Sequence, residues 1–466
     1  MPSPASDNTR SSRPKRAAAS ANRGPATDGR HAALDAVARQ AERFPDLLPV
    51  SPETSHLDAR DAQFASAIYD ATVRRWLTLT AMLNMRLKRP LSKTDPVLRA
   101  ALLGGAAQLV FMGGVPVHAA IGETVGWAKA RSGKSGAGMV NAVLRRIADS
   151  LGDVVSEPWD NRRDALPLAD GMTRLLADQV FAEDPLVRLM EAASCPRALL
   201  RRWTGAVGEE QTRSRAMHGL VRPPVILNTS QHSGELTETA EHAKTGHRVF
   251  DGVAGSLSSF LDRYPKVWVQ DPSSSGGIES VQELLADDRL GLVIDMCAGI
   301  GTKTRQLLAH MAGGRLIATD QEESKLRQLE ASPALEGNVE TTTLDELPLS
   351  FAGQADLVLL DVPCSNTGVL PRRPEARYRA ATEQVNRLVD TQRQIVADAI
   401  RLLSPRGAIL YATCSLEPEE NAGISEWACK WHGFARSAER FIEPQGLPGD
   451  PASNYWDGAY SVVLKR

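Results

Sequence analysis

The spacing of apolar residues divides the chain into segments of different character. Between residues 30 and 152, apolar side chains such as Phe64, Ile68 and Val73 recur every three to five positions, which is typical of one face of an α-helix. We therefore predict an all-helical domain over these residues, built from five or more helices.

The last third of the chain follows a different pattern, in which short apolar runs alternate with helical periods. The expected strands cover residues 290–296, 315–320, 339–346, 355–363, 408–414 and 460–466, and the expected helices cover 302–311, 322–331, 380–403 and 418–431. This alternation is typical of a parallel, doubly wound α/β sheet, which binds ligands beyond the carboxyl ends of its strands. We predict a Rossmann-like α/β domain over residues 276–466.

Three further segments complete the predicted multidomain organisation. Residues 1–29 contain no Val, Ile, Leu or aromatic residue and are expected to form a disordered tail. Residues 153–190 are polar and are interpreted as a connector with some helix. Residues 191–275 combine the helical stretch "CPRALLRRWTGAVG" with the short strand patterns "PPVILN" and "KVWVQD", and they predict a small α+β module.

Composition and charge add one asymmetry to this picture. A chain of 466 residues with 42% hydrophobic residues is long enough for about two to four domains. The formal net charge is only −2, yet residues 1–150 contain 21 Lys and Arg against 12 Asp and Glu. A basic front half indicates contact with a polyanion, although a merely solvated charged surface would give the same count.

The chain lacks several sequence signals. No stretch reaches the roughly 18 consecutive apolar residues of a membrane span, and no apolar segment near the N-terminus resembles a secretory signal. We expect a cytoplasmic protein without a membrane partner. Five cysteines form no CxxC pair and no Cys/His cluster, so neither a disulfide framework nor a metal site is predicted.

Candidate ligand-binding residues follow three successive predicted strands. Asp295 ends the first strand, and Gly299 and Gly301 in "DMCAGIGTKT" allow a tight turn before a helix. This turn is neither a phosphate loop nor GxGxxG, which disfavours a nucleoside triphosphate or NAD. Asp320 is placed to accept hydrogen bonds from ribose hydroxyls, and Asp345 from an adenine amino group. The set suits S-adenosylmethionine, although aspartates also cap helices and form turns, which leaves other nucleotides open.

Two cysteines stand at the ends of neighbouring predicted strands, Cys364 in "DVPCSNTG" and Cys414 in "ATCSLEPEEN". A thiolate near a helix N-terminus can act as a nucleophile. Addition of a thiolate to carbon 6 of cytosine makes carbon 5 reactive enough to accept a methyl group. Asp361, three residues before Cys364, is placed to bond the cytosine edge. A single free cysteine is more often a buried apolar residue, which is how Cys195, Cys297 and Cys429 are interpreted.

These motifs resemble those of a known family. "DVPCSNTG", "ATCSLEPEEN" and "CAGIGTKT" are similar to motifs of the RNA (cytosine-5) methyltransferases of the Sun/NOL1/NOP2 family. In the front half, "RAALLGGAAQLVFMGGVPVHAAIGETVGWAK" and "GMVNAVLRRI" resemble the NusB-like helical RNA-binding domain. The resemblance covers about residues 30–150 and 265–466. The pairing of the two domains is that of bacterial enzymes that act on 16S ribosomal RNA.

The resemblance implies roles for particular residues. Cys414 of the "TCS" motif would be the nucleophile, Cys364 of the "PCS" motif would assist product release, and Asp361 would contact the base. DNA cytosine methyltransferases use a proline-cysteine motif for the nucleophile, so the second motif favours RNA. Arg372 and Arg373 would form a basic stretch near the substrate. The implied residues of the S-adenosylmethionine site are Cys297, Ala298, Gly299, Ile300, Gly301, Thr302, Lys303, Asp320, Asp345 and Asp361.

The glycine turn departs from the family pattern Cys-Ala-Ala-Pro-Gly-Gly-Lys-Thr. Gly299, Ile300 and Thr302 replace Ala, Pro and the second Gly. A β-branched residue at position 302 would strain the turn if that position required a positive φ. The expected function is methylation of carbon 5 of a cytidine in 16S ribosomal RNA by a monomer. The alternatives are the same reaction on transfer RNA, or a non-catalytic RNA-binding factor in ribosome assembly whose cofactor turn has decayed.

Overall fold

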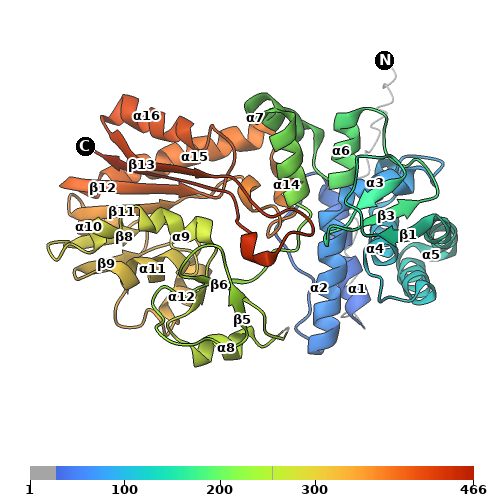
Figure 1. The fold of residues 1–466 in the computed structure, drawn as a ribbon, viewed down its shortest axis with the longest axis horizontal. Helices are drawn as coiled ribbons and strands as arrows, with labels where there is room; N and C mark the ends of the chain where they lie inside the picture. The colour runs from blue at the N-terminus through green and yellow to red at the C-terminus, as the bar shows by residue number, and fades with distance from the viewer. Residues whose placement is uncertain (1–27, 254) are drawn as a thin grey trace, which may run out of the picture.

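The computed structural model describes residues 28–253 and 255–466, so the tail predicted over residues 1–29 falls almost entirely outside the described residues. Figure 1 shows a helical half that contains α1 to α5 and a half built around a large sheet, with α6, α7 and α14 between them. Within the described residues, no helix combines the length and apolarity needed to cross a membrane.

The helical half contains the predicted N-terminal domain. Its elements are α1 (Gly29–Arg43), α2 (Ala59–Arg74), α3 (Trp76–Asn84), the 3-10 turn η1 (Leu91–Lys93), α4 (Pro96–Phe111) and α5 (Val117–Asp149). Helix α4 is buried along most of its length and packs against α1 and α5. Two glycines permit this close packing, because a Cβ at Gly104 would lie 2.5 Å from Leu34 and one at Gly105 would lie 2.5 Å from Leu144.

The segment expected to be a connector forms a small sheet that the sequence pattern did not predict. Strands β1 (Leu151–Val155), β2 (Ala165–Pro167) and β3 (Thr173–Leu176) pair antiparallel in the order β1-β3-β2. Strands of three to five residues are too short to give a clear alternating pattern. Helices α6 (Pro185–Ala193) and α7 (Arg197–His218) follow and lead to the second half.

The small α+β module contains a four-stranded sheet with the order β5-β6-β4-β7. The two predicted strand patterns contribute β4 (Ile226–Asn228) and β7 (Trp268–Val269), which pair with each other. The remaining elements are β5 (Thr239–Glu241), β6 (His247–Phe250) and α8 (Leu257–Arg263).

The C-terminal domain is built on a seven-stranded sheet with the order β10-β9-β8-β11-β12-β14-β13. The five strands from β10 to β12 are parallel, whereas β14 and β13 are antiparallel to their neighbours. The strands are β8 (Leu292–Asp295), β9 (Arg315–Ala318), β10 (Glu340–Thr341), β11 (Ala355–Asp361), β12 (Leu403–Thr413), β13 (Ala435–Ile442) and β14 (Ala459–Lys465). Their order changes direction between β8 and β11, which is where such sheets bind ligands.

Helices cover both faces of this sheet. Along β11, Val358 and Leu360 face one cluster of buried residues, and Leu357 and Leu359 face another. The first cluster includes α15 (Thr382–Ile400) and α16 (Ala422–His432), and the second includes α9 (Pro272–Glu279), α10 (Gln282–Leu285) and α11 (Thr302–His310). The other short helices are α12 (Glu323–Glu330), α13 (Leu347–Phe351), η2 (Thr367–Val369), α14 (Ala376–Arg379) and η3 (Ala452–Asn454). The predicted fold class is therefore confirmed, with a mixed rather than wholly parallel sheet.

The sequence pattern was wrong about two details of this sheet. The strand expected over residues 339–346 is reduced to Glu340–Thr341, which leaves Asp345 in the turn before α13. Strand β13 was not predicted, because its sequence "ARSAERFI" is charged and its residues are exposed. Charged residues on an edge strand discourage pairing with another chain, and they also hide the apolar alternation that identifies a strand.

The loop that follows Cys364 joins the two halves of the molecule. Leu370, Ala376 and Tyr378 belong to the same buried cluster as the core of the helical domain. The hydroxyl of Tyr378 donates to the carbonyl of Val73 at 2.9 Å. Arg377 is 1% exposed and donates to four carbonyls, those of Ala193, Ser194, Gly219 and Leu370. The buried cluster of the helical half therefore extends onto this loop of the half that contains the large sheet.

We predict that Arg377→Met destabilises the protein by roughly 2 to 5 kcal/mol, because four buried carbonyls lose their donor. Urea unfolding followed by tryptophan fluorescence measures the change. Arg387→Met is the matched control, since Arg387 is exposed and donates to the side chain of Gln384 on its own helix. Equal unfolding midpoints for the two variants would contradict the prediction.

Candidate active site

The two predicted cysteines meet at the carboxyl ends of β11 and β12. These strands are parallel neighbours, and Asp361 pairs with Ala412 in their register. Cys364 lies three residues beyond Asp361, and Cys414 lies two residues beyond Ala412. Their Sγ atoms are 3.2 Å apart. The carboxyl ends of the parallel strands point toward the middle of the molecule, where α7 and α14 lie (Figure 1).

The two thiols have different surroundings. Cys364 is 8% exposed, whereas Cys414 is partly exposed and contacts Oδ1 of Asn366 at 3.2 Å. The hydrogen bond with Cys414, together with burial, raises the pKa of Cys364 well above its usual value. A raised pKa keeps Cys364 protonated at neutral pH, so its S–H can donate to the sulfur of Cys414.

The glycine turn after β8 is unstrained despite its unusual sequence. Gly299 and Gly301 adopt positive φ angles of 57° and 89°, which glycine tolerates. Thr302 is the first residue of α11, so the β-branched side chain occupies a helical position. The strain that the sequence would imply at position 302 does not arise, because positive φ falls on Gly301, which the family pattern also has, and on Gly299, which replaces its Ala. The N–H of Gly299 donates to Oδ2 of Asp320 at 2.9 Å, which ties the turn to the end of β9.

A cavity of about 710 Å³ opens beside this turn. Five of the ten predicted cofactor residues line it: Cys297, Gly299, Asp320, Asp345 and Asp361. Leu344, Leu347 and Pro348 add an apolar wall. Carboxylates that can accept from hydroxyl and ammonium groups, next to an apolar wall for a flat base, fit S-adenosylmethionine.

The other five predicted cofactor residues do not line this cavity. Ala298 and Gly301 pack against buried residues behind the turn, and Thr302 begins α11. Ile300 is 64% exposed. The ammonium group of Lys303 lies 2.7 Å from Oδ2 of Asp361. Burial lowers the pKa of Lys303, but the charge and hydrogen bond of Asp361, together with the nearby Cys414 and Asp295, raise it by more, so the net pKa is raised.

A smaller cavity of about 180 Å³ lies on the other side of Cys414. Lys303 lines this cavity, together with Ser274 and Tyr460. Asp361 and Cys414 line both cavities. A ligand in the larger cavity and a ligand in the smaller one would therefore meet at these two residues.

Arg372 does not have the surroundings that the sequence pattern implied. Its guanidinium donates to Asp457 at 2.5 Å and to Asp271 at 3.3 Å, and also to the carbonyl of Pro224. These partners raise the pKa of Arg372 despite burial. Burial and the neighbouring carboxylate of Asp457 raise the pKa of Asp271 to about 6. Arg372 thus connects three segments of the chain instead of offering free donors to a substrate.

Sequence patterns missed the part of the larger cavity that α15 contributes. Ile395, Asp398 and Arg401 line it from the end of that helix. Residues of this type are common on any amphipathic helix, so no motif distinguishes them. Glu420 was also missed as an individual residue, although it lies inside the motif "ATCSLEPEEN".

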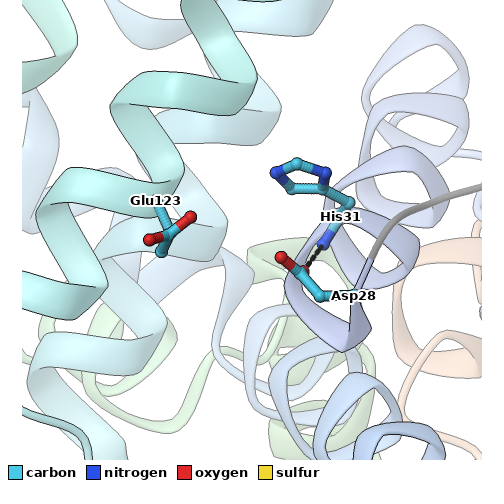
Figure 2. A group of neighbouring side chains, drawn as sticks. All are labelled: Asp28, His31 and Glu123. Carbon is cyan, nitrogen blue, oxygen red and sulfur yellow. Dashed lines mark hydrogen bonds between the residues drawn. The ribbon is translucent and has the colours of Figure 1, made fainter.

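Among the described residues, one group could offer a metal three ligands. Asp28, His31 and Glu123 have ligand atoms within 4.8 Å of one another, and Figure 2 shows them at the start of α1 and on α5. Asp28 also caps α1, since its Oδ1 accepts from the N–H of His31 at 2.9 Å. The group lies in the helical domain, apart from the two cavities.

Comparisons with known proteins agree with both halves of the fold. A family model described as 16S rRNA methyltransferase RsmB/F matches residues 283–450, and the NusB family model matches residues 30–149. The solved structure of PH0851 covers 94% of this chain and 98% of its own, with 18% identity and a TM-score of 0.66, a similarity that shows the fold alone.

Curated relatives cover most of the chain. The ribosomal RNA small subunit methyltransferase B of Xanthomonas campestris pv. campestris is 30% identical over 371 residues, which are 78% of each chain. The protein with the same name from Cronobacter sakazakii is 28% identical over 456 residues, 94% of this chain and 98% of the relative. The chain therefore belongs to the 16S rRNA methyltransferase RsmB/F family and is an S-adenosylmethionine-dependent RNA methyltransferase.

Proposed function

We propose that this enzyme methylates carbon 5 of a cytidine in 16S ribosomal RNA through a covalent adduct between Cys414 and carbon 6 of the base. The observation that carries the proposal is the pair of thiols 3.2 Å apart, with Cys414 on the boundary between the two cavities. The larger cavity would hold the cofactor, and the smaller one would take the unstacked base.

In the proposed reaction, the thiolate of Cys414 adds to carbon 6, and carbon 5 becomes nucleophilic. S-adenosylmethionine supplies the methyl group, which carbon 5 accepts. Loss of the proton on carbon 5 then restores the ring, breaks the bond between sulfur and carbon 6, and frees Cys414. Asp361 and Lys303 line the base cavity as an ion pair and would bond the polar edge of the cytosine.

The environment of Cys364 supports a role in the release step. Its pKa is raised chiefly by the hydrogen bond with Cys414. Formation of the bond between Cys414 and carbon 6 removes a charged sulfur from this pair, which lowers the pKa of Cys364. Cys364 can then release its own S–H proton to solvent, and the resulting thiolate can accept the proton from carbon 5, which is the step that expels Cys414.

The alternative of a non-catalytic assembly factor receives no support from the glycine turn. The backbone keeps positive φ at Gly299 and Gly301, and the turn remains bonded to Asp320. Both thiols and Asp361 are also retained. We assign RNA binding to residues 30–152, with the small module over residues 191–275 beside the catalytic domain. Affinity should fall as salt rises, because phosphate contacts release counterions.

We predict that Cys414→Ala abolishes methylation, because no thiolate remains to activate carbon 5. Cys364→Ala should accumulate a covalent RNA–protein complex, visible as a shifted band on a denaturing gel, because the adduct forms but is released slowly. Cys429→Ala is the control and should behave as wild type, since Cys429 lies on α16 and lines neither cavity. Normal turnover by Cys364→Ala without a shifted band would refute these roles.

We predict that Asp320→Ala weakens S-adenosylmethionine binding by about 10- to 100-fold, the loss expected for hydrogen bonds to a charged group. Isothermal titration calorimetry of the full chain measures the affinity. The exposed Asp390→Ala serves as the control. Wild-type protein that gives no heat with millimolar S-adenosylmethionine would favour a decayed site instead.

We predict that deproteinised 16S ribosomal RNA accepts methyl groups, and that bisulfite sequencing finds the product as a cytidine that resists conversion. RNA that is not yet assembled should react best, because its target base can be unstacked at lower cost. Transfer RNA is the parallel substrate. Methylation of transfer RNA alone would assign the same chemistry to the other substrate.

A further inference from the structure

Glu420 is a fully buried acid that lies between the two cysteine loops, at 0% exposure. It follows Cys414 by six residues in the sequence and lines neither cavity. A buried carboxylate is costly unless hydrogen bonds compensate for the loss of water, so its contacts indicate what it does.

Each of the two carboxylate oxygens of Glu420 accepts two hydrogen bonds. Oε1 accepts from the backbone N–H of Ser365 at 2.9 Å and from the side-chain amide of Gln392 at 3.0 Å. Oε2 accepts from the hydroxyls of Ser365 and Ser415, each at 2.5 Å. Ser365 directly follows Cys364, and Ser415 directly follows Cys414, so one carboxylate holds the residues next to both thiols.

Neighbouring contacts fix Glu420 itself. The hydroxyl of Tyr411, a buried residue of β12, donates to the Glu420 carbonyl at 2.7 Å. Gln392, which comes from α15, also donates to the carbonyl of Pro363 at 3.0 Å. On the next residue, Asn421 bonds the hydroxyl of Thr413 and the carbonyl of Ser415. The chain on either side of each cysteine is therefore held by groups around Glu420.

We propose that Glu420 is a positioning residue, which sets the separation of the two thiols by binding the residues that follow them. This inference rests on the proposed function for its catalytic consequence, but the positioning itself does not depend on RNA. The sulfur atoms belong to two separate loops. A single carboxylate that accepts two hydrogen bonds at each oxygen bridges those loops directly. Glu420 does not contact the reacting atoms.

The neutral donors around Glu420 also predict which substitutions it should tolerate. Burial raises the pKa of Glu420, and the four hydrogen bonds oppose that rise. In Glu420→Gln, the amide oxygen can keep the bonds at Oε1, and the two serine hydroxyls can rotate to accept from the new NH₂ group. In Glu420→Ala, all four donors lose their acceptor.

The test compares Glu420→Ala, Glu420→Gln and Ser415→Ala with wild type. We expect Glu420→Ala to lower kcat by about 100-fold, the typical cost of a 1 Å misplacement of a reacting group. KM for RNA and for S-adenosylmethionine should change little, because the residue lines neither cavity. Glu420→Gln should recover most of kcat. Ser415→Ala should fall between wild type and Glu420→Ala, since it removes one of the four bonds.

A second experiment measures the separation of the Cys364 and Cys414 thiols without substrate. Dibromobimane becomes strongly fluorescent when it links two nearby thiols, and Cys364→Ala gives the background from the other cysteines. Glu420→Ala should link its thiols more slowly than wild type, and Glu420→Gln should restore the rate. The matched control is Glu419→Ala, because Glu419 is the exposed acid next to Glu420. This substitution should change neither kcat nor the cross-linking rate.

Unchanged kcat and unchanged cross-linking in folded Glu420→Ala would overturn the proposal. If circular dichroism shows that Glu420→Ala does not fold, the test rests on Glu420→Gln and Ser415→Ala. Wild-type kcat and wild-type cross-linking rates in both of these variants would also overturn the proposal. Failure of the proposed function gives a different result. In that case wild-type enzyme would not methylate RNA, while the order of cross-linking rates among the variants would still test the positioning role.

Discussion

The parallel pairing of β11 with β12 is the constraint on which the active site depends. Asp361 is paired with Ala412, and the two thiols follow at the same edge of the sheet. A shift of one residue would turn every side chain of a strand to the opposite face, so the hydrophobic layers on both faces fix this register. The 3.2 Å contact between Cys364 and Cys414 is therefore set by the packing of the whole domain as well as by local bonds.

The loop after Cys364 links the active-site end of the sheet to the helical half. Its first residues are bonded to Glu420, and Tyr378 belongs to the buried cluster of the helical domain and donates to the carbonyl of Val73. On the other side, Glu417 accepts hydrogen bonds from Arg202 and Trp203 of α7. Both cysteine loops thus have one end in the sheet and another against the helical half. Displacement of either half would be transmitted to the thiols through buried contacts.

The sequence was informative where a residue's position along a strand decides its environment. Apolar runs predicted β8, β9, β11 and β12, and the residues at or just after the ends of these strands include Asp320, Asp361 and both cysteines. Short or polar strands were not predictable, as β1 to β3 and β13 show, because their partners and not their own pattern stabilise them. The altered turn was hard to interpret for a related reason, since only the backbone reveals that Thr302 begins a helix.

The unequal environments of the thiols illustrate the same limit. Both cysteines follow a strand and precede a serine, so their local sequences differ little. Cys364 is buried, its pKa is raised by the hydrogen bond with Cys414 and by burial, and it lines only the larger cavity. Cys414 is partly exposed and lines both cavities. The accessible thiol can reach a base, and the buried thiol can only exchange a proton with its partner or with the base carbon held next to it. The proposed order, in which Cys414 attacks first and Cys364 assists release, thus follows from the burial of each thiol and from the cavities that each one lines.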